Sequence, residues 1–297
     1  MTNNKDFGIV TACDKNYFPG VVALIKSINL NSPLPVSVID QGMTPDQLKQ
    51  TQALGATPIS VDRCIKIDDE RFGCCYVLFD IDMAPYENIL YLDADMIVFD
   101  DLSHLGKLIA KHGMLWSIAN PAKLLRNKRY RPKIYNLVKN IKNIENSNEF
   151  YHEYKNYCGK NLLRRRNTRL NSGILGVKKD LMRKIKKEIP KYNYFLDKFK
   201  YPDQDLLSLI KSDLGIKGYQ LSYEYNACKL HIKYNKICNA RFENKHLYIS
   251  ENTSILGLRP DNLKIKILHY NNHEKPWLPN SSLKEGFKEI WEYYYNL

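Results

Sequence analysis

The sequence contains no uninterrupted stretch of about 18 apolar residues, the length that a membrane-spanning helix needs. Its opening, MTNNKDFGIV, lacks the basic and then apolar layout of a secretory signal. The seven cysteines are an odd number and include no Cys-x-x-Cys pair, which favours reduced, buried thiols over a disulfide framework or a zinc site. These absences predict a cytoplasmic protein.

Acidic residues are the minority charge. The chain has 32 Asp and Glu against 45 Lys and Arg, a formal net charge of +13. This excess indicates an anionic partner, and composition leaves open whether it is nucleic acid, an anionic membrane surface or a phosphorylated substrate. Basic residues concentrate in a poorly periodic stretch at about 122–168, which we interpret as an insert projecting from the fold.

The apolar segments of the N-terminal part alternate between strand and helix patterns. Residues 7–12, 35–39 and 57–61 read as strands, and Thr44 with Gln47 forms a capping box that starts a helix. This β-α-β-α-β order predicts an α/β fold with a mostly parallel sheet and helices on both faces. The turn at 12–17 follows the first strand, at the sheet edge where open α/β proteins bind ligands.

We predict one catalytic domain over 1–280, which includes the basic insert, followed by a C-terminal amphipathic helix over 281–297. Apolar residues recur at helical spacing in this last segment, with lysines alongside. Such a helix can lie on an anionic membrane, and the alternative is that it packs on the core.

Two carboxylates follow a predicted buried strand at 87–92. Asp93 and Asp95 are two residues apart, so in an extended segment both side chains point the same way while Ala94 faces the other side. Oxygen ligands of this kind suit magnesium or manganese. The alternative is a turn or a helix cap, which Asp also favours. The apolar strand before the pair favours the metal site.

Other polar residues also stand at predicted element ends. His269 follows a short apolar run, and its imidazole is a normal ligand for manganese-class metals, with Lys275 six residues on, within reach of a phosphate. Asn171 precedes an apolar strand, and Asp203 and Gln204 begin a helix, where the alternative role is N-capping.

Taken in order, these segments resemble the motifs of the retaining glycosyltransferases of family 8. The resemblance covers nearly the whole chain, from residue 7 to residue 277. The segments that carry it are 12–17, 91–95, 171–173, 203–205 and 269–277.

The resemblance implies a GT-A fold, a Rossmann-like mixed sheet, and a bound Mn²⁺ or Mg²⁺ held by Asp93, Asp95 and His269. It implies transfer of a hexose from a UDP-sugar to a saccharide or lipid-linked glycan acceptor, with retention of configuration. Bacterial surface glycan synthesis, such as lipopolysaccharide biosynthesis at the inner face of the plasma membrane, is the expected setting. The implied donor-binding residues are Ala12, Asp14, Asn16, Tyr17, Asp93, Ala94, Asp95, Asn272 and Lys275. The residues implied at the reaction centre are Asn171, Asp203 and Gln204.

The sequence departs from the family pattern at two places. The family has an Arg or Lys about sixteen or seventeen residues before the Asp-x-Asp, where this chain has residues 75–78, Cys-Tyr-Val-Leu. Arg71 or a residue of the basic insert is the expected substitute. The family glycine three residues after the metal-binding histidine is Asn272 here.

Two other functions are alternatives for parts of this sequence. A sugar-nucleotide nucleotidyltransferase needs a glycine-rich, basic phosphate loop after the first strand, and residues 14–17, Asp-Lys-Asn-Tyr, are not such a loop. A nucleic-acid-binding protein would use the basic run at 164–169 and neighbouring tyrosines, but this leaves Asp93, Asp95 and His269 unexplained. We therefore expect no nucleic-acid partner.

Overall fold

The computed structural model describes most of the chain outside the predicted insert. Arg71, Asn272 and the insert at 122–168 lie outside the described residues. The described residues are 6–65, 75–118, 170–196, 201–228, 238–251, 263–271, 274–279, 281, 283 and 285–297.

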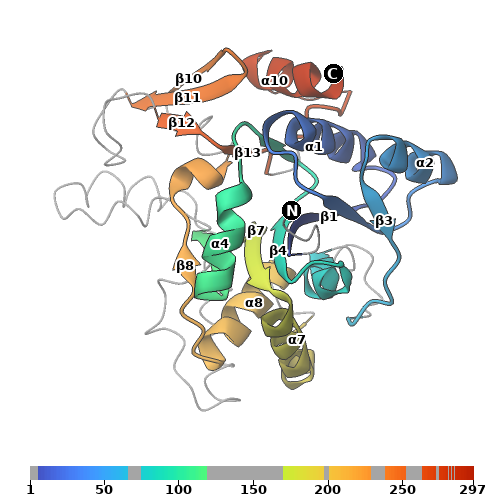
Figure 1. The fold of residues 1–297 in the computed structure, drawn as a ribbon, viewed down its shortest axis with the longest axis vertical. Helices are drawn as coiled ribbons and strands as arrows, with labels where there is room; N and C mark the ends of the chain where they lie inside the picture. The colour runs from blue at the N-terminus through green and yellow to red at the C-terminus, as the bar shows by residue number, and fades with distance from the viewer. Residues whose placement is uncertain are drawn as a thin grey trace.

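A mixed sheet of seven strands forms the centre of the described structure (Figure 1). Its strands are β1 (Phe7–Cys13), β2 (Val36–Asp40), β3 (Thr57–Ile59), β4 (Asn88–Leu92), β6 (Met114–Ile118), β7 (Leu170–Lys178) and β8 (Tyr219–Gln220). In space they follow the order β3-β2-β1-β4-β7-β6-β8. All neighbours pair in parallel except β7, which is antiparallel to both β4 and β6. The predicted α/β fold with a mostly parallel sheet is confirmed.

Helices cover both faces of this sheet. Because successive residues of a strand point to opposite sides, each strand contributes side chains to the core on both faces. Val10 and Ile89 pack into one core cluster with α7, α8 and the 3₁₀ helix η1, whereas Ile9 and Leu90 pack into the other with α1 and α4. These helices are α1 (Phe18–Asn31), η1 (Cys75–Met83), α4 (Ser103–His112), α7 (Lys179–Glu188) and α8 (Pro202–Asp213). Both faces of the sheet are therefore buried.

The predicted capping box begins helix α2 (Pro45–Ala53). The backbone N–H of Gln47 donates to Thr44 Oγ1 at 3.2 Å, and the N–H of Thr44 donates to Gln47 Oε1 at 2.9 Å. These reciprocal bonds satisfy two donors at the helix start.

A second sheet, which the sequence did not predict, joins distant parts of the chain. It consists of β5 (Met96–Val98), β13 (Ile267–His269) and β9 (Ala227–Cys228), with β13 in the middle. β13 runs antiparallel to β5 and places His269 opposite Met96. The sheet therefore brings a residue near the C-terminus beside the segment that leaves β4.

The C-terminal helix α10 (Glu285–Tyr295) packs on the protein rather than standing apart. It lies beside α1 (Figure 1), and Lys26 Nζ donates to the Tyr295 carbonyl oxygen at 2.6 Å. Its apolar residues are buried in a cluster with a third, antiparallel sheet, β10 (Cys238–Glu243), β11 (His246–Glu251) and β12 (Leu263–Ile265). The apolar face of the helix is therefore occupied by the core. Every helix in the described part of the chain is too short or too polar to cross a membrane.

The two cysteines whose side chains are described differ in environment. Cys13 is buried at the end of β1, as predicted, whereas Cys64 is exposed, so the prediction was wrong for Cys64. Cys64 lies in the segment after β3, and its backbone N–H donates to the Asp80 carboxylate of η1 at 3.2 Å.

Candidate metal and donor site

Asp93 and Asp95 lie on the short link between the large sheet and the small one. The Asp93 N–H donates to the Gly173 carbonyl oxygen of β7 at 2.9 Å. On the other side, the Asp95 carbonyl oxygen accepts from the Tyr270 N–H at 2.9 Å. Because each sheet holds one end of the link, the backbone at both aspartates is fixed.

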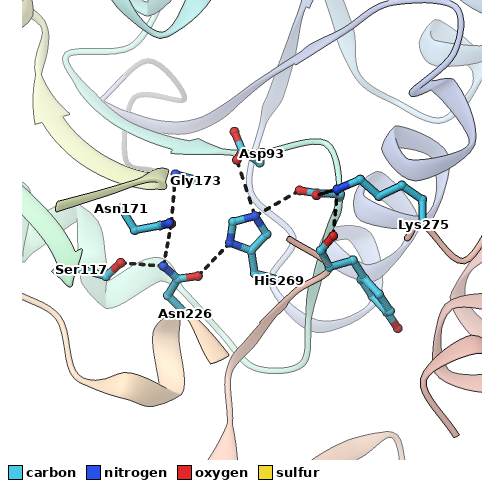
Figure 2. Close-up of polar contacts among 9 residues, drawn as sticks. Asp93, Ser117, Asn171, Gly173, Asn226, His269 and Lys275 are labelled. Carbon is cyan, nitrogen blue, oxygen red and sulfur yellow. Dashed lines mark hydrogen bonds and ion pairs between the residues drawn. The ribbon is translucent and has the colours of Figure 1, made fainter. Parts of the chain in front are cut away.

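His269 completes a group of three potential metal ligands (Figure 2). Its Nε2 lies 3.3 Å from Asp95 Oδ1 and 3.6 Å from Asp93 Oδ2. One ligand atom from each residue lies within 4.8 Å of the others. The His269 and Asp95 side chains are buried, whereas 34% of the Asp93 side chain is exposed, so the group opens to solvent at Asp93.

The chemistry of these groups fits a divalent cation. Asp95 Oδ1 is buried and, within the described part of the chain, has no hydrogen-bond partner, a condition that costs free energy unless a cation or donor satisfies the oxygen. Two carboxylates and an imidazole are ligands that suit Mn²⁺, and Mg²⁺ also accepts carboxylate oxygens. Gly173 leaves the necessary room, because a Cβ there would lie 2.8 Å from Asp93 Oδ2.

The two carboxyl groups differ in their electrostatic environment. Burial alone would raise the pKa of Asp95, but Lys275 and His269 outweigh burial and hold that pKa well below its usual range. Desolvation and the charge of Asp95 raise the pKa of Asp93. Lys275 and His269 thus favour the ionised form of Asp95, whereas the ionised form of Asp93 depends more on a cation.

Lys275 lies on the side of Asp95 that faces away from His269. Its ammonium group forms a buried ion pair with Asp95 Oδ2 and donates to the Tyr270 carbonyl oxygen at 2.8 Å. The same nitrogen lies 5.5 Å from the centre of the Tyr17 ring. The Trp277 ring packs edge-on against Tyr17, with 5.8 Å between the two ring centroids. A fixed positive charge therefore stands between the carboxylates and an aromatic pair.

The turn after β1 brings the predicted nucleoside-binding residues to the same edge of the sheet. Asp14 Oδ1 accepts the N–H groups of Asn16 at 2.9 Å and Tyr17 at 2.8 Å, so one carboxylate oxygen is used to shape the turn. Tyr17 remains 41% exposed, whereas Ala12 and Ala94 are buried. Their roles in donor binding stay predictions.

The antiparallel direction of β7 brings Asn171, one of the predicted reaction-centre residues, to this edge. Asn171 stands at the start of β7, near the point where β4 ends at Leu92, just before Asp93, and its Oδ1 accepts from the Gly173 N–H at 3.1 Å. Asp203 and Gln204 open α8, and Gln204 is buried. Desolvation, helped by the charge of Asp93 and opposed by a hydrogen bond with Ser172, raises the pKa of Asp203 to about 7.

Sequence reasoning missed Asn226 and Ser117. Asn226 Oδ1 lies 3.1 Å from His269 Nδ1, and its Nδ2 donates to Ser117 Oγ at 2.6 Å and to Asn171 Oδ1 at 2.8 Å. Asn226 precedes the two-residue strand β9, a segment too short to show any periodicity. No signal in the sequence singles it out.

The segment at 75–78 contributes core rather than charge. Tyr76, Val77 and Leu78 are buried in the cluster beneath the sheet, and Tyr76 donates its hydroxyl to the Leu196 carbonyl oxygen at 2.8 Å. The expected substitutes for the family's basic residue, Arg71 and the insert, lie outside the described residues.

Comparison with known proteins identifies the family. A family model described as glycosyl transferase family 8 matches residues 8–281. Galactosyltransferase LgtC, solved with donor and acceptor sugar analogues, aligns with a TM-score of 0.62 at 18% identity and covers 97% of this chain and 95% of that chain. The glycosyltransferase GlyE of Streptococcus pneumoniae TIGR4 has a TM-score of 0.57 at 18% identity, over 98% of this chain and 61% of that chain.

A third structure, the bifunctional glycosyltransferase WbbM, has a TM-score of 0.61 at 15% identity, over 99% of this chain and 50% of that chain. The chain thus spans only about half to three-fifths of GlyE and WbbM. At these identities the structural likeness establishes the GT-A fold.

No curated protein sequence matches the chain at a significant level. The family model, by contrast, spans most of the chain, so the resemblance predicted from the motifs is confirmed and the nucleotidyltransferase and nucleic-acid-binding alternatives are set aside. The protein belongs to glycosyl transferase family 8 and is a glycosyltransferase.

Proposed function

We propose that the protein is a metal-dependent, retaining hexosyltransferase that uses a UDP-sugar and Mn²⁺ or Mg²⁺. The observation that carries this proposal is the convergence of Asp93, Asp95 and His269 within 4.8 Å. Asp95 Oδ1 also supports it, because this buried oxygen has no hydrogen-bond partner among the described residues and faces the imidazole where a cation would lie.

The reaction breaks the bond between the anomeric carbon and the diphosphate, so negative charge builds on the leaving group. Asp93, Asp95 and His269 would hold a divalent cation, which supplies electrostatic stabilisation of that charge when bound. Lys275 adds a second positive charge that is already oriented by Asp95 and the Tyr270 carbonyl oxygen. One preorganised contact of this kind contributes about 3 kcal/mol to catalysis.

Retention follows if the acceptor hydroxyl attacks on the face that the diphosphate leaves. Asp203 and Gln204 would stabilise the positive charge on the sugar rather than form a lasting covalent bond, and Asn171 would line the same sugar. The nearness of Asp203 to Asp93, which contributes to its raised pKa, supports this placement beside the phosphates. NMR of the first-formed product tests it, and an inverted anomer would refute it.

The remaining roles concern the nucleoside and the acceptor. Asp14 and Asn16 would hydrogen-bond the uridine, Tyr17 would stack on its base, and Ala12, Ala94 and Asn272 would line the donor. The acceptor would be a saccharide or lipid-linked glycan of the bacterial surface, as in lipopolysaccharide synthesis, reached from the cytoplasmic side. Contact with an anionic membrane would use the basic insert, since the apolar face of α10 is buried.

The direct test incubates the protein with a panel of UDP-hexoses and Mn²⁺, with and without chelator, and measures released UDP. Donor hydrolysis needs no acceptor, so the acceptor need not be known. Release should require metal and fall at least about 100-fold in Asp95→Asn, consistent with the loss of about 3 kcal/mol of stabilisation.

The matched control is Asp101→Asn, which alters an exposed carboxylate that accepts from the Ser103 N–H at the start of α4, outside the candidate site. It should release UDP at the wild-type rate. Chelator-resistant UDP release, or unchanged release in Asp95→Asn, would contradict the proposed function.

A further inference from the structure

A chain of hydrogen bonds runs from the backbone of β7 to the metal-facing imidazole (Figure 2). It begins at the Gly173 N–H, which donates to Asn171 Oδ1, continues through the Asn226 amide, and ends at His269 Nδ1. Asn226 and His269 are each only 4% exposed. Water is therefore poorly placed to replace these bonds.

The first bond fixes the direction of all the others. A backbone N–H can only donate, so the Asn171 atom that it contacts must be the amide oxygen. The Asn226 atom facing that oxygen must then be its NH₂ group, which also donates to Ser117 Oγ at 2.6 Å. The remaining Asn226 atom, the one facing His269, is consequently the amide oxygen.

This direction decides which nitrogen of His269 carries a proton. An amide oxygen only accepts, so Nδ1 must be protonated and donate to Asn226 at 3.1 Å. In the neutral ring the lone pair is then on Nε2, the nitrogen that faces both Asp93 and Asp95. A lone pair directed at two carboxylates needs a cation or a proton between them.

We propose that Asn226 is a positioning residue that holds His269 in the tautomer able to bind the metal. The proposal rests on the proposed function for the identity of the cation. Asn226 also ties the imidazole to Asn171, so the ligand ring and the predicted sugar-binding amide are oriented by one side chain. Outer partners of this kind typically contribute 10–100-fold to metal affinity.

Two substitutions at Asn226 separate positioning from general packing. Asn226→Leu removes the acceptor of the imidazole N–H at similar volume, whereas Asn226→Asp keeps an acceptor and removes the amide donor. The Mn²⁺ affinity of the full chain can be measured from the EPR signal of free Mn²⁺. This affinity should fall about 10–100-fold in Asn226→Leu and stay within about threefold of wild type in Asn226→Asp. Equal affinities in Asn226→Leu and wild type would overturn the proposal.

The matched control is Asn31→Leu, because Asn31 also donates from a half-buried amide, to the Val98 carbonyl oxygen at 2.9 Å, but lies outside the hydrogen-bond chain. It should leave Mn²⁺ affinity within about twofold of wild type. A loss in Asn31→Leu equal to that in Asn226→Leu would show that the effect is general destabilisation, and would also overturn the proposal.

A spectroscopic readout tests the tautomer without activity. In ¹⁵N-histidine-labelled protein loaded with Mg²⁺, the His269 Nδ1–H resonance should be present in wild type and in Asn226→Asp and lost to solvent exchange in Asn226→Leu. A proton on Nε2 and none on Nδ1 would refute the assignment. Failure of wild type to bind either metal would instead refute the proposed function, because the Nδ1–H can still be observed in the metal-free protein.

Discussion

Gly173→Ala tests whether the room between the ligands is required for the cation. The added Cβ would lie 2.4 Å from His269 Cε1, 2.8 Å from Asp93 Oδ2 and 3.0 Å from Asn171 Oδ1. An ordinary carbon–carbon contact is about 3.5–4.0 Å, so the imidazole must move by about 1 Å. Cε1 is bonded to both ring nitrogens, so Nε2 moves with it.

A displacement of this size is large for a metal ligand, whose bond lengths tolerate only about ±0.2 Å. We expect Gly173→Ala to weaken Mn²⁺ binding by about 100-fold, or about 2.7 kcal/mol, and to destabilise the fold by about 1–3 kcal/mol through overpacking. Isothermal titration calorimetry with Mn²⁺ measures the first effect, and urea unfolding of the metal-free protein measures the second.

The matched control is Gly176→Ala on the same strand. Its Cβ would lie 2.9 Å from Ile109 Cγ1 and 2.9 Å from Leu115 Cβ, so it clashes with the core of α4 and β6 instead of the ligands. It should lose stability in the same range and keep Mn²⁺ affinity. Wild-type affinity in folded Gly173→Ala, or equal losses of affinity in both variants, would refute the geometric reasoning.

Two further predictions concern the charges of the site. Lys275→Met leaves the buried Asp95 carboxylate without its cation partner, so the metal-free protein should lose about 3–5 kcal/mol of stability in urea unfolding, and Mn²⁺ should restore part of it. The pKa of Asp203 is about 7 in the folded protein, above the ordinary 3.8. Between these two pH values the folded metal-free protein binds a proton that the unfolded chain does not. The free energy of unfolding should therefore fall as pH rises from about 3.8 to about 7, by at most about 4 kcal/mol. Asp203→Asn should remove that slope in urea unfolding at a series of pH values, and an unchanged slope would contradict the assignment.

The sequence predicted those parts of the fold whose signals are local. Strands β1 and β4 are mostly apolar, and the Thr44 capping box marks its own helix start. Asp93 and Asp95 could be recognised because they directly follow such a strand. These features depend on neighbours in the chain, so a single sequence contains them.

The parts that were not predicted depend on long-range pairing. The antiparallel direction of β7 is not encoded in its own residues, although it determines that Asn171 lies near Asp93. The small sheet contains strands of two and three residues, which have no measurable periodicity. Asn226 acquires its role only once β9 pairs beside His269, so nothing in its local sequence distinguishes it from other asparagines.

The attachment of the Asp93–Asp95 link to two different sheets has a consequence for assembly. The Gly173 carbonyl oxygen in the large sheet holds the first aspartate, and the Tyr270 N–H beside the small sheet holds the second. The group of three potential ligands is therefore complete only once strand β13, which is distant from the link in the sequence, has docked. Until β13 pairs with β5, the imidazole of His269 does not lie beside the two carboxylates, and a partly folded chain lacks the third ligand.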